Sequence, residues 1–215
     1  MSIASNIEEI KSEIPETATL VAVSKTKPNE DILEAYNAGQ RIFGENKVQE
    51  LVQKYEDLPK DIQWHLIGHL QTNKVKYIAP FVDLIHAVDS IKLLKEINKQ
   101  ALKNNRIINC LLQVKIAVEE SKFGLSTTDA EVLINGNEVQ QLKGINIVGL
   151  MGMSTNTSDS EQVKKEFNTL YQFYNDYPQF SILSMGMSSD YKIALEEGSN
   201  MIRVGSTIFG ERNYS

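Results

Sequence analysis

One lysine stands where the chain could place a reactive amine at the end of a strand. The segment LVAVSKTKP, residues 20–28, is an apolar run followed at once by Lys25 and closed by Pro28. A short apolar run bounded by turn residues favours a buried strand. A lysine partly desolvated at such a position has a lowered pKa, and its neutral amine can condense with an aldehyde. The alternative is a solvated surface lysine, which is our interpretation of Lys27.

Polar groups follow the last two apolar runs of the chain. The string MIRVGSTIFGE, residues 201–211, places Gly205 and Ser206 between a predicted strand and a short helix, where backbone N–H groups would face an anion. The run before it ends in SMGMSSD, so Ser188 and Ser189 would add hydroxyls if the two strands are neighbours. Each string alone is also explained by a tight turn and a helix cap. The two together favour a phosphate site.

An arginine lies inside the last predicted strand. Arg203 precedes Gly205 by two residues, so the alternation of a strand points both to the same side. If an aldehyde with a pyridine ring occupied the site, the guanidinium could meet the ring nitrogen and keep it unprotonated, because arginine does not give up its proton. The alternative is an arginine paired with a carboxylate. Amine, phosphate cradle and arginine together suggest pyridoxal 5'-phosphate.

Strands and helices alternate along the chain. Helical apolar faces lie between short apolar or β-branched runs, for example Ile91 to Ala101 and Val163 to Tyr174. Eight such runs are found: TLVAVS (19–24), RIFGE (41–45), QWHLIG (63–68), LIHAVD (84–89), INCLLQVKI (108–116), INIVGLM (145–151), SILSMG (181–186) and MIRVG (201–205). This alternation predicts parallel strands covered by helices.

Eight strands can close into an α/β barrel of the (β/α)8 type, whose functional groups gather at the carboxyl ends of the strands. The competing fold is an open doubly wound sheet, which usually has a glycine-rich turn after its first strand; here that turn reads SKTKP. Residues 3–14 are predicted to form an extra amphipathic N-terminal helix. Residues 1–215 are predicted to form a single domain.

Helix ends have their own signals in the sequence. Thr128 with Glu131, and Ser158 with Glu161, have the spacing of capping boxes. Gly39 and a second glycine, Gly198, follow helical stretches, where a left-handed residue is wanted.

Composition restricts the class of partner. The 215 residues carry a net charge of -6 and contain no long run of basic residues, so nucleic acid is not expected as a partner. The single cysteine, Cys110, cannot pair within the chain, which suits a reducing compartment. No apolar run approaches membrane-spanning length, so we expect a cytoplasmic protein that binds a small molecule.

Seven strings in order along nearly the whole chain resemble the pyridoxal phosphate homeostasis protein family. These strings are VAVSKTKP (21–28), FGEN-x-VQE (43–50), WHLIGHLQTNK (64–74), the K-x-G of SKFGL (122–124), GLM (149–151), SMGMSSDY (184–191) and IRVGSTIFGER (202–212). The resemblance implies a barrel like the N-terminal domain of alanine racemase, with pyridoxal 5'-phosphate held as an internal aldimine on a lysine.

The same resemblance assigns roles to matching residues. It makes Lys25 the aldimine lysine, Arg203 the partner of the pyridine nitrogen, and Ser188, Gly205 and Ser206 the phosphate contacts. Asn46 and His65 would lie near the ring or its entrance.

The spacing of His65 and His69 is that of a metal pair, but Gly68 and the strand-like run before it argue against the helix that would align the two rings. We therefore expect no metal site. Trp64 and the tyrosines are expected in the core or at the rim.

Two functions of different classes remain open. The resemblance implies a carrier or buffer of the cofactor in vitamin B6 homeostasis, without clear turnover, which would pass it to apoenzymes and exist as a monomer or weak dimer. The alternative is an amino-acid racemase, which needs an acid/base group on each face of the cofactor, whereas Lys25 serves one. In alanine racemase that second base is a tyrosine from a further domain, and we expect none here. A cofactor-free aldolase with a lysine imine is a third possibility, although such enzymes usually carry that lysine on a later strand.

Overall fold

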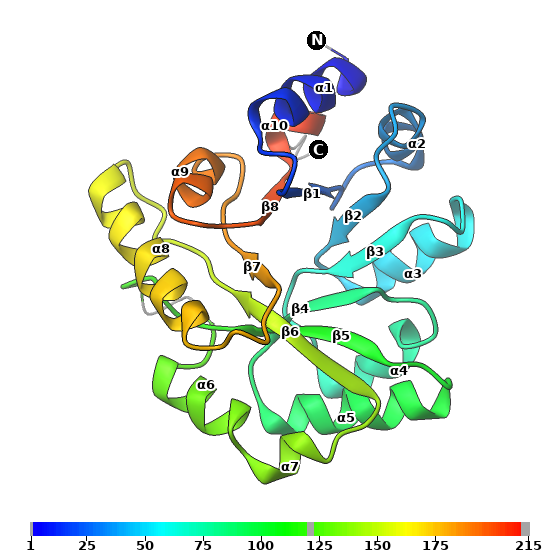
Figure 1. Cartoon of the computed structure of the whole chain (residues 1–215). Coiled ribbons are helices and arrows are strands. Elements are labelled where there is room, and N and C mark those ends of the chain that lie inside the picture. The colour runs from blue at the N-terminus through cyan, green and yellow to red at the C-terminus, as the bar shows by residue number, and fades with distance from the viewer. Residues whose placement is uncertain (1, 120–122, 212–215) are drawn as a thin grey trace.

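The chain folds into a closed parallel barrel. The computed structural model describes residues 2–119 and 123–211, and within these residues eight strands pair in chain order, with β8 returning to pair with β1 (Figure 1). The strands are β1 Thr19–Val23, β2 Ile42–Glu45, β3 Gln63–Leu66, β4 Leu84–Val88, β5 Ile108–Gln113, β6 Ile145–Met151, β7 Ile182–Ser184 and β8 Met201–Val204. All eight predicted strands and the barrel are confirmed.

Helices follow the strands and cover the outside of the barrel (Figure 1). They are α1 Ile3–Glu13, α2 Asn29–Asn37, α3 Val48–Asp57, the 3-10 helix η1 Thr72–Lys74, α4 Val75–Ile78, α5 Ile91–Lys103, α6 Thr127–Ile134, α7 Asn137–Gln140, α8 Ser160–Asn175, α9 Tyr191–Glu196 and α10 Ser206–Phe209. Among the described residues, none of these helices has the length and apolarity needed to span a bilayer.

Alternation along the strands separates two cores. Side chains such as Leu20 and Ile202 belong to the large cluster between the strands and the helices, whereas Val21 and Met201 belong to a smaller cluster inside the barrel. Because successive side chains point to opposite faces, the inward set of β8 continues from Met201 to Arg203. The barrel interior is therefore apolar at one end and becomes polar toward the carboxyl ends of the strands.

The predicted N-terminal helix is present and packs on the barrel. Ile7 and Ile10 of α1 are buried, and the helix lies beside α2 and α10 (Figure 1). Asn6 Nδ2 donates to the carbonyl oxygen of Ile208 at 2.9 Å, and Tyr191 Oη donates to Glu13 Oε2 at 2.7 Å. These bonds join α1 to the last helix and to α9.

Two helix starts differ from the predicted capping boxes. Ser126 Oγ, not Thr128, accepts the first-turn N–H of α6, from Asp129 at 3.0 Å. The side chain of Asp159, not Ser158, caps α8. Both segments contain several adjacent side chains able to cap, and the spacing alone cannot choose among them. The two predicted glycine terminators are confirmed, since Gly39 and Gly198 have φ of 87° and 93°.

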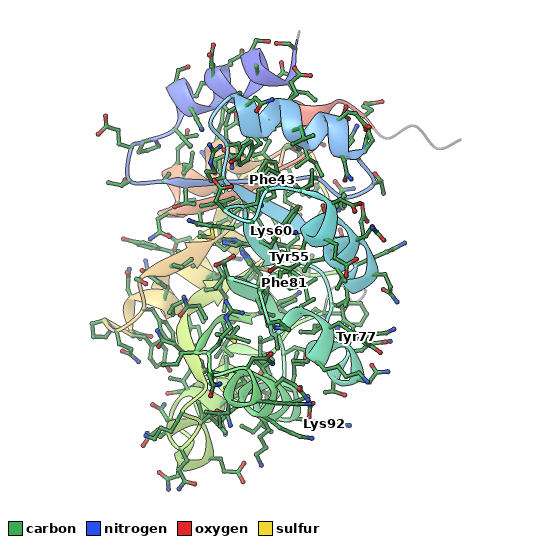
Figure 2. All side chains as sticks on the ribbon, turned by 90° about the vertical axis from the view of Figure 1, so that its right-hand side faces the viewer. Phe43, Tyr55, Lys60, Tyr77, Phe81 and Lys92 are labelled. Atoms are coloured by element: carbon green, nitrogen blue, oxygen red, sulfur yellow. The ribbon has the colours of Figure 1, made fainter. Side chains whose placement is uncertain are left out.

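Aromatic contacts fix α3 against its neighbours. The ring of Tyr55 on α3 stacks on Phe81, with centroids 3.8 Å apart and planes 5° apart (Figure 2). Under the same helix, Trp64 is fully buried and its ring centroid lies 5.9 Å from that of Phe43. Of the two positions expected for Trp64, core or rim, the structure shows the core.

Candidate functional site: a cavity at the carboxyl ends of the strands

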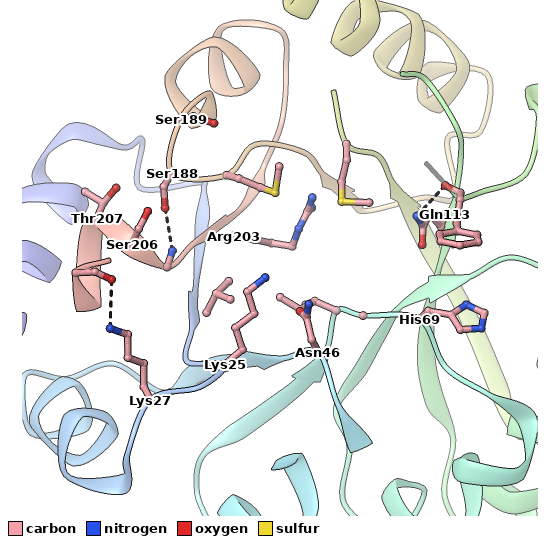
Figure 3. A pocket seen from close by; sticks show the side chains of 18 residues that line it. Lys25, Lys27, Asn46, His69, Gln113, Ser188, Ser189, Arg203, Ser206 and Thr207 are labelled. Atoms are coloured by element: carbon pink, nitrogen blue, oxygen red, sulfur yellow. Dashed lines mark hydrogen bonds between the residues drawn. The ribbon is translucent and has the colours of Figure 1, made fainter. Parts of the chain in front are cut away.

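A cavity of about 610 Å³ opens at the carboxyl ends of the strands (Figure 3). Its lining includes most of the residues that the sequence singled out, namely Lys25, Asn46, Ser188, Ser189, Arg203, Gly205 and Ser206. They come from segments as far apart as residues 25 and 206, and closure of the barrel between β8 and β1 brings them together. The predicted gathering of these residues at one end of the barrel is confirmed.

Lys25 lies two residues after the end of β1, and it is half-buried. Figure 3 shows it extending into the cavity between Arg203 and Asn46. The residue after it, Thr26, has a φ of 65°, a left-handed conformation that is uncommon outside glycine. The chain therefore turns sharply away after Lys25, and the lysine remains pointed into the cavity.

Arg203 forms part of the cavity floor and is only 4% exposed. Its Nη1 donates to the carbonyl oxygen and the Oγ of Ser184 at 2.9 and 2.6 Å, and its Nη2 donates to the carbonyl oxygen of Gly152 at 3.1 Å. Burial lowers the pKa of Arg203 to about 10, while the charge of Asp190 acts in the opposite direction. The guanidinium thus stays protonated at neutral pH and its orientation is fixed.

His65 does not line the cavity, in contrast to the expected position near the ring or its entrance. It lies in the barrel interior and is 4% exposed. It precedes Ile67 by two residues, so the two side chains point to the same face, but only Ile67 is near enough to the strand end to line the cavity. Its Nδ1 is 3.0 Å from Nε2 of His86, whose Nδ1 is 3.2 Å from Ser184 Oγ. Burial lowers the pKa of His65 to about 3 and that of His86 well below its ordinary value. His65 reaches Arg203 through this chain, from beneath the cavity.

The other histidine of the H-x-x-x-H spacing lies elsewhere. His69 is exposed at the cavity mouth, where its ring lies 5.8 Å from that of Phe123 and its Nδ1 lies 3.7 Å from Asp89 Oδ2. Within the described part of the chain, no three His, Cys, Asp or Glu side chains are grouped to hold a metal ion.

The predicted anion side of the cavity is built from two neighbouring loops. Ser188 Oγ accepts the N–H of Gly205 at 3.1 Å, so the loop after β7 is bonded to the loop after β8. The first turn of α10, with Ser206 and Thr207, borders the cavity beside them. N–H groups of a first helical turn have no carbonyl partner within the helix and face outward. Thr207 was missed from the sequence, although it directly follows the recognised Gly205-Ser206 pair.

Lys27 is not the solvated surface lysine predicted from the sequence. Its Nζ donates to the carbonyl oxygens of Phe209, Gly210 and Glu211 at 2.7, 3.2 and 3.2 Å. These carbonyls end α10, and a cation satisfies them as it does at other helix carboxyl ends. The residue two positions after Lys25 thus holds the helix that borders the anion side.

Asn46 follows β2 and its segment is packed tightly on the loop after β3. A Cβ on Gly68 would lie 2.4 Å from the carbonyl oxygen of Asn46, so only glycine permits this approach. Gly68 therefore has a packing role: it allows the loop after β3 to approach the backbone of Asn46. Both residues line the cavity.

The wall on the side of β5 was not predicted. Gln113, the last residue of β5, lines the cavity and its Nε2 donates to the carbonyl oxygen of Phe123 at 2.9 Å. The predicted strand extended to residue 116, three residues beyond the end of β5, so Gln113 was not recognised as a residue at the strand end. Ser121 and Lys122 of the string SKFGL lie outside the described residues.

A buried carboxyl lies behind the Lys25 segment. Glu45, the last residue of β2, accepts Ser24 Oγ at 2.5 Å and Lys54 Nζ at 2.8 Å. Burial raises the pKa of Glu45 to about 7, although Lys54 and Ser24 act in the opposite direction. Burial is the dominant cause, because among the described residues Oε2 of this carboxyl has no hydrogen-bond donor that would stabilise its ionised form.

The donor set of the cavity has three parts: an amine that a carbonyl carbon can reach, hydroxyl and backbone N–H groups suited to a phosphate, and a buried cation that can only donate. A ligand that carries an aldehyde, a phosphate and an unprotonated ring nitrogen fits this set, because each of its groups meets a complementary one. The lining offers no equivalent match for a bare metal ion.

The chain matches known proteins over its full length. The profile of the family described as "Alanine racemase, N-terminal domain" matches residues 1–213. The pyridoxal phosphate homeostasis protein of Vibrio alginolyticus is 41% identical over 233 residues, covering 100% of this chain and 99% of that one. The protein of the same name from Aquifex aeolicus is 40% identical and covers 92% and 88% of the two chains.

Solved structures agree with the closed barrel. PipY of Synechococcus elongatus, solved with PLP bound, superimposes with a TM-score of 0.87 at 36% identity, covering 97% of this chain and 100% of that chain. An alanine racemase of Clostridium difficile superimposes with a TM-score of 0.81 over 100% of this chain and 58% of that one. Its identity is 15%, so this second similarity concerns the fold alone.

Proposed function

Because the chain belongs to the alanine racemase N-terminal domain family and, within it, to the pyridoxal phosphate homeostasis proteins, we propose that it binds pyridoxal 5'-phosphate on Lys25. The observation that carries this proposal is a single cavity lined by Lys25, Arg203, Ser188 and Gly205.

Each part of the site has its own task in this proposal. The cofactor supplies an aldehyde, and the amine of Lys25 holds it by a reversible covalent bond. Ser206 and the N–H groups beside it bind the phosphate, together with Ser188 and Gly205. Arg203 would meet the ring nitrogen, and a guanidinium that can only donate would favour the unprotonated ring. Asn46, which lines the cavity after β2, would lie near the ring.

His65 supports the site from a distance. It lies beneath the cavity and is joined to Arg203 through His86 and Ser184. In the proposed function His65 helps to fix the guanidinium and makes no contact with the cofactor.

The proposed role is homeostasis of vitamin B6 inside the cell, without turnover of a substrate. The protein would keep a reactive aldehyde bound and pass it to apoenzymes. The racemase alternative is not favoured, because relatives about 40% identical over nearly the whole chain carry the homeostasis name, while the racemase similarity concerns the fold alone.

Spectroscopy combined with chemical trapping tests the proposal. Purified protein mixed with pyridoxal 5'-phosphate should gain a visible absorption band, and borohydride reduction should leave the added mass on the peptide that contains Lys25. Lys25→Ala should abolish both signals. The matched control Lys99→Ala removes an exposed lysine on α5 and should leave them unchanged. A label on another lysine, or no label, would refute the proposal. Solvent deuterium entering the α-carbon of an amino acid would instead support the racemase alternative.

A further inference from the structure

The two glutamates of the string FGEN-x-VQE form a hydrogen-bonded cluster with Lys54 behind Lys25. Lys54 Nζ on α3 donates to Glu45 Oε1 at 2.8 Å and to Glu50 Oε1 at 2.7 Å. Lys54 is 5% exposed and Glu45 is fully buried. Glu50 is only partly buried, with a side chain 23% exposed. We call Glu45, Glu50 and Lys54 the glutamate–lysine triad.

The glutamate–lysine triad holds both peptide groups that flank the Cα of Lys25. On one side, Lys54 Nζ donates to the carbonyl oxygen of Ser24 at 2.8 Å. On the other side, the N–H of Thr26 donates to Glu50 Oε1 at 2.6 Å. A residue whose two peptide planes are fixed has a fixed Cα–Cβ direction. The triad therefore sets the direction in which the Lys25 side chain leaves the backbone.

The conformation that the triad holds is an unfavourable one. Thr26 is β-branched and has a φ of 65°, so the bond to Glu50 maintains a backbone state that the residue would rarely adopt alone. Such outliers persist where the surroundings over-determine them, and they concentrate at functional sites. Here the outlier immediately follows the lysine that the cavity requires.

Stability does not account well for the triad. Charges taken out of water are costly, and buried ion pairs are often no more stabilising than apolar residues of the same size. Lys54 donates one hydrogen bond each to Ser24, Glu45 and Glu50, yet Glu45 Oε2 has no hydrogen-bond partner within the part of the chain that the structure describes. The triad thus leaves one carboxylate oxygen of Glu45 unsatisfied but fixes the backbone from Ser24 to Thr26, which suits a role in positioning Lys25.

The platform that carries the triad is itself rigid. Tyr55, which follows Lys54 on α3, stacks on Phe81 with the two ring planes 5° apart (Figure 2). Glu50 and Lys54 are one helical turn apart and so present their charged groups together toward the Lys25 segment. Movement of α3 would therefore move the Lys25 backbone.

We propose that Glu50 and Lys54, supported by Glu45, are positioning residues that aim Lys25 into the cavity and so control how readily it is attached to an aldehyde. The inference rests on the proposed function, because it takes Lys25 as the attachment site. It adds that the reactivity of this lysine depends on a charged cluster that makes no contact with the cofactor.

The test compares attachment of pyridoxal 5'-phosphate in four variants: Glu50→Ala, Glu50→Gln, Lys54→Met and Leu51→Ala. Glu50→Ala and Lys54→Met should slow attachment at Lys25 by about tenfold or more, since a tenfold change corresponds to about 1.4 kcal/mol, no more than one charged hydrogen bond. Glu50→Gln keeps an oxygen that accepts from both Thr26 and Lys54, and should stay within about twofold of the wild type. Rates are read from the visible band and from borohydride-trapped peptides.

Leu51→Ala is the matched control for loss of stability on the same helix. It removes buried volume without touching the triad, and should lower the melting temperature while leaving the attachment rate unchanged. If Leu51→Ala slows attachment as much as Glu50→Ala, the triad is merely structural and the inference is refuted. Wild-type rates in folded Glu50→Ala and Lys54→Met would refute it equally.

Amide hydrogen exchange separates failure of this inference from failure of the proposed function. The N–H of Thr26 should exchange slowly in the wild type and in Glu50→Gln, and faster in Glu50→Ala. If the wild type carries no label on Lys25, the proposed function and the positioning role are both refuted. Slow exchange of the Thr26 N–H would then show only that its hydrogen bond to Glu50 is present. If the label is on Lys25 but Thr26 exchanges equally in all variants, the inference alone fails.

Discussion

Two buried side chains should make the stability of this protein depend on pH in opposite directions over the same range. The pKa of Glu45 is raised by burial from 4.5 to about 7, and the pKa of His65 is lowered by burial from 6.5 to about 3. Between pH 4.5 and 6.5 both residues therefore differ in protonation between the folded and unfolded chains. We predict that single substitutions will separate the two contributions.

The signs follow from proton counting. In this range folded Glu45 holds a proton that the unfolded chain has lost, so the free energy of unfolding falls by about 1.4 kcal/mol per pH unit as the pH rises. Unfolded His65 holds a proton that the folded chain lacks, so its contribution rises by about 1.4 kcal/mol per pH unit. Because each group is half-titrated in the unfolded chain at one end of the range, the change between pH 4.5 and 6.5 is about 2 kcal/mol for each group, and the two changes oppose each other. His86, whose pKa is also lowered, acts in the same direction as His65.

Urea unfolding of the wild type, Glu45→Gln and His65→Gln at pH 4.5, 5.5 and 6.5 measures these slopes. Relative to the wild type, Glu45→Gln should gain about 2 kcal/mol of stability between the lowest and the highest pH, and His65→Gln should lose about as much. Differences from the wild type cancel the contributions of the exposed carboxylates. If the Glu45→Gln curve runs parallel to the wild type, Glu45 is already ionised in the folded chain and the reasoning is wrong.

Three further predictions concern packing and the last helix. Gly149→Ala would place a Cβ 1.7 Å from the carbonyl oxygen of Ile182 on β7, so calorimetry should show a loss of stability of about 3–5 kcal/mol, and an unchanged melting temperature would contradict this. Lys27→Met removes the cation that donates to the carbonyl oxygen of Phe209, so hydrogen exchange of peptides covering residues 205–211 should become faster, while the strands keep their protection. Equal exchange rates for these peptides in the variant and the wild type would exclude this role of Lys27. Burial raises the pKa of Cys110 to about 12, so a thiol reagent should label the native protein only on unfolding, and rapid labelling of folded protein would contradict its buried position.

The strands and most of the cavity could be predicted because their signals are local. Eight apolar runs of strand length and the helical faces between them determine the barrel, and strand alternation correctly places Arg203 and Gly205 on one face. In a parallel barrel the carboxyl ends of all strands meet at one end, so Lys25 and Ser188 are brought together once the fold is known. These predictions required no knowledge of individual contacts.

Buried polar partnerships could not be predicted, because each depends on residues far apart in the sequence. Lys54 has the spacing of an ordinary helix-surface residue, and only its contacts with Ser24 and Glu45, 30 and 9 positions away, make it a buried cation. Lys27 likewise has no local signal for partners 182 positions later. The resemblance placed His65 near the ring or its entrance, but His65 lies two residues before the cavity-lining Ile67 and is therefore deeper in the barrel.

The chain from His65 to Arg203 has one consistent direction of hydrogen bonding. A guanidinium only donates, so Ser184 Oγ accepts from Arg203 and its single hydrogen is free to donate to Nδ1 of His86. Nε2 of His86 then carries the hydrogen and donates to Nδ1 of His65. We assign both rings as neutral on this basis, in agreement with the lowered pKa of each. The arginine is thus the single charge at one end of a chain of neutral partners, and its orientation is determined by the barrel before any ligand enters the cavity. A lysine at this position could not keep two bonds to Ser184 and one to Gly152 in the same plane, so the requirement is for a guanidinium and not merely for a positive charge.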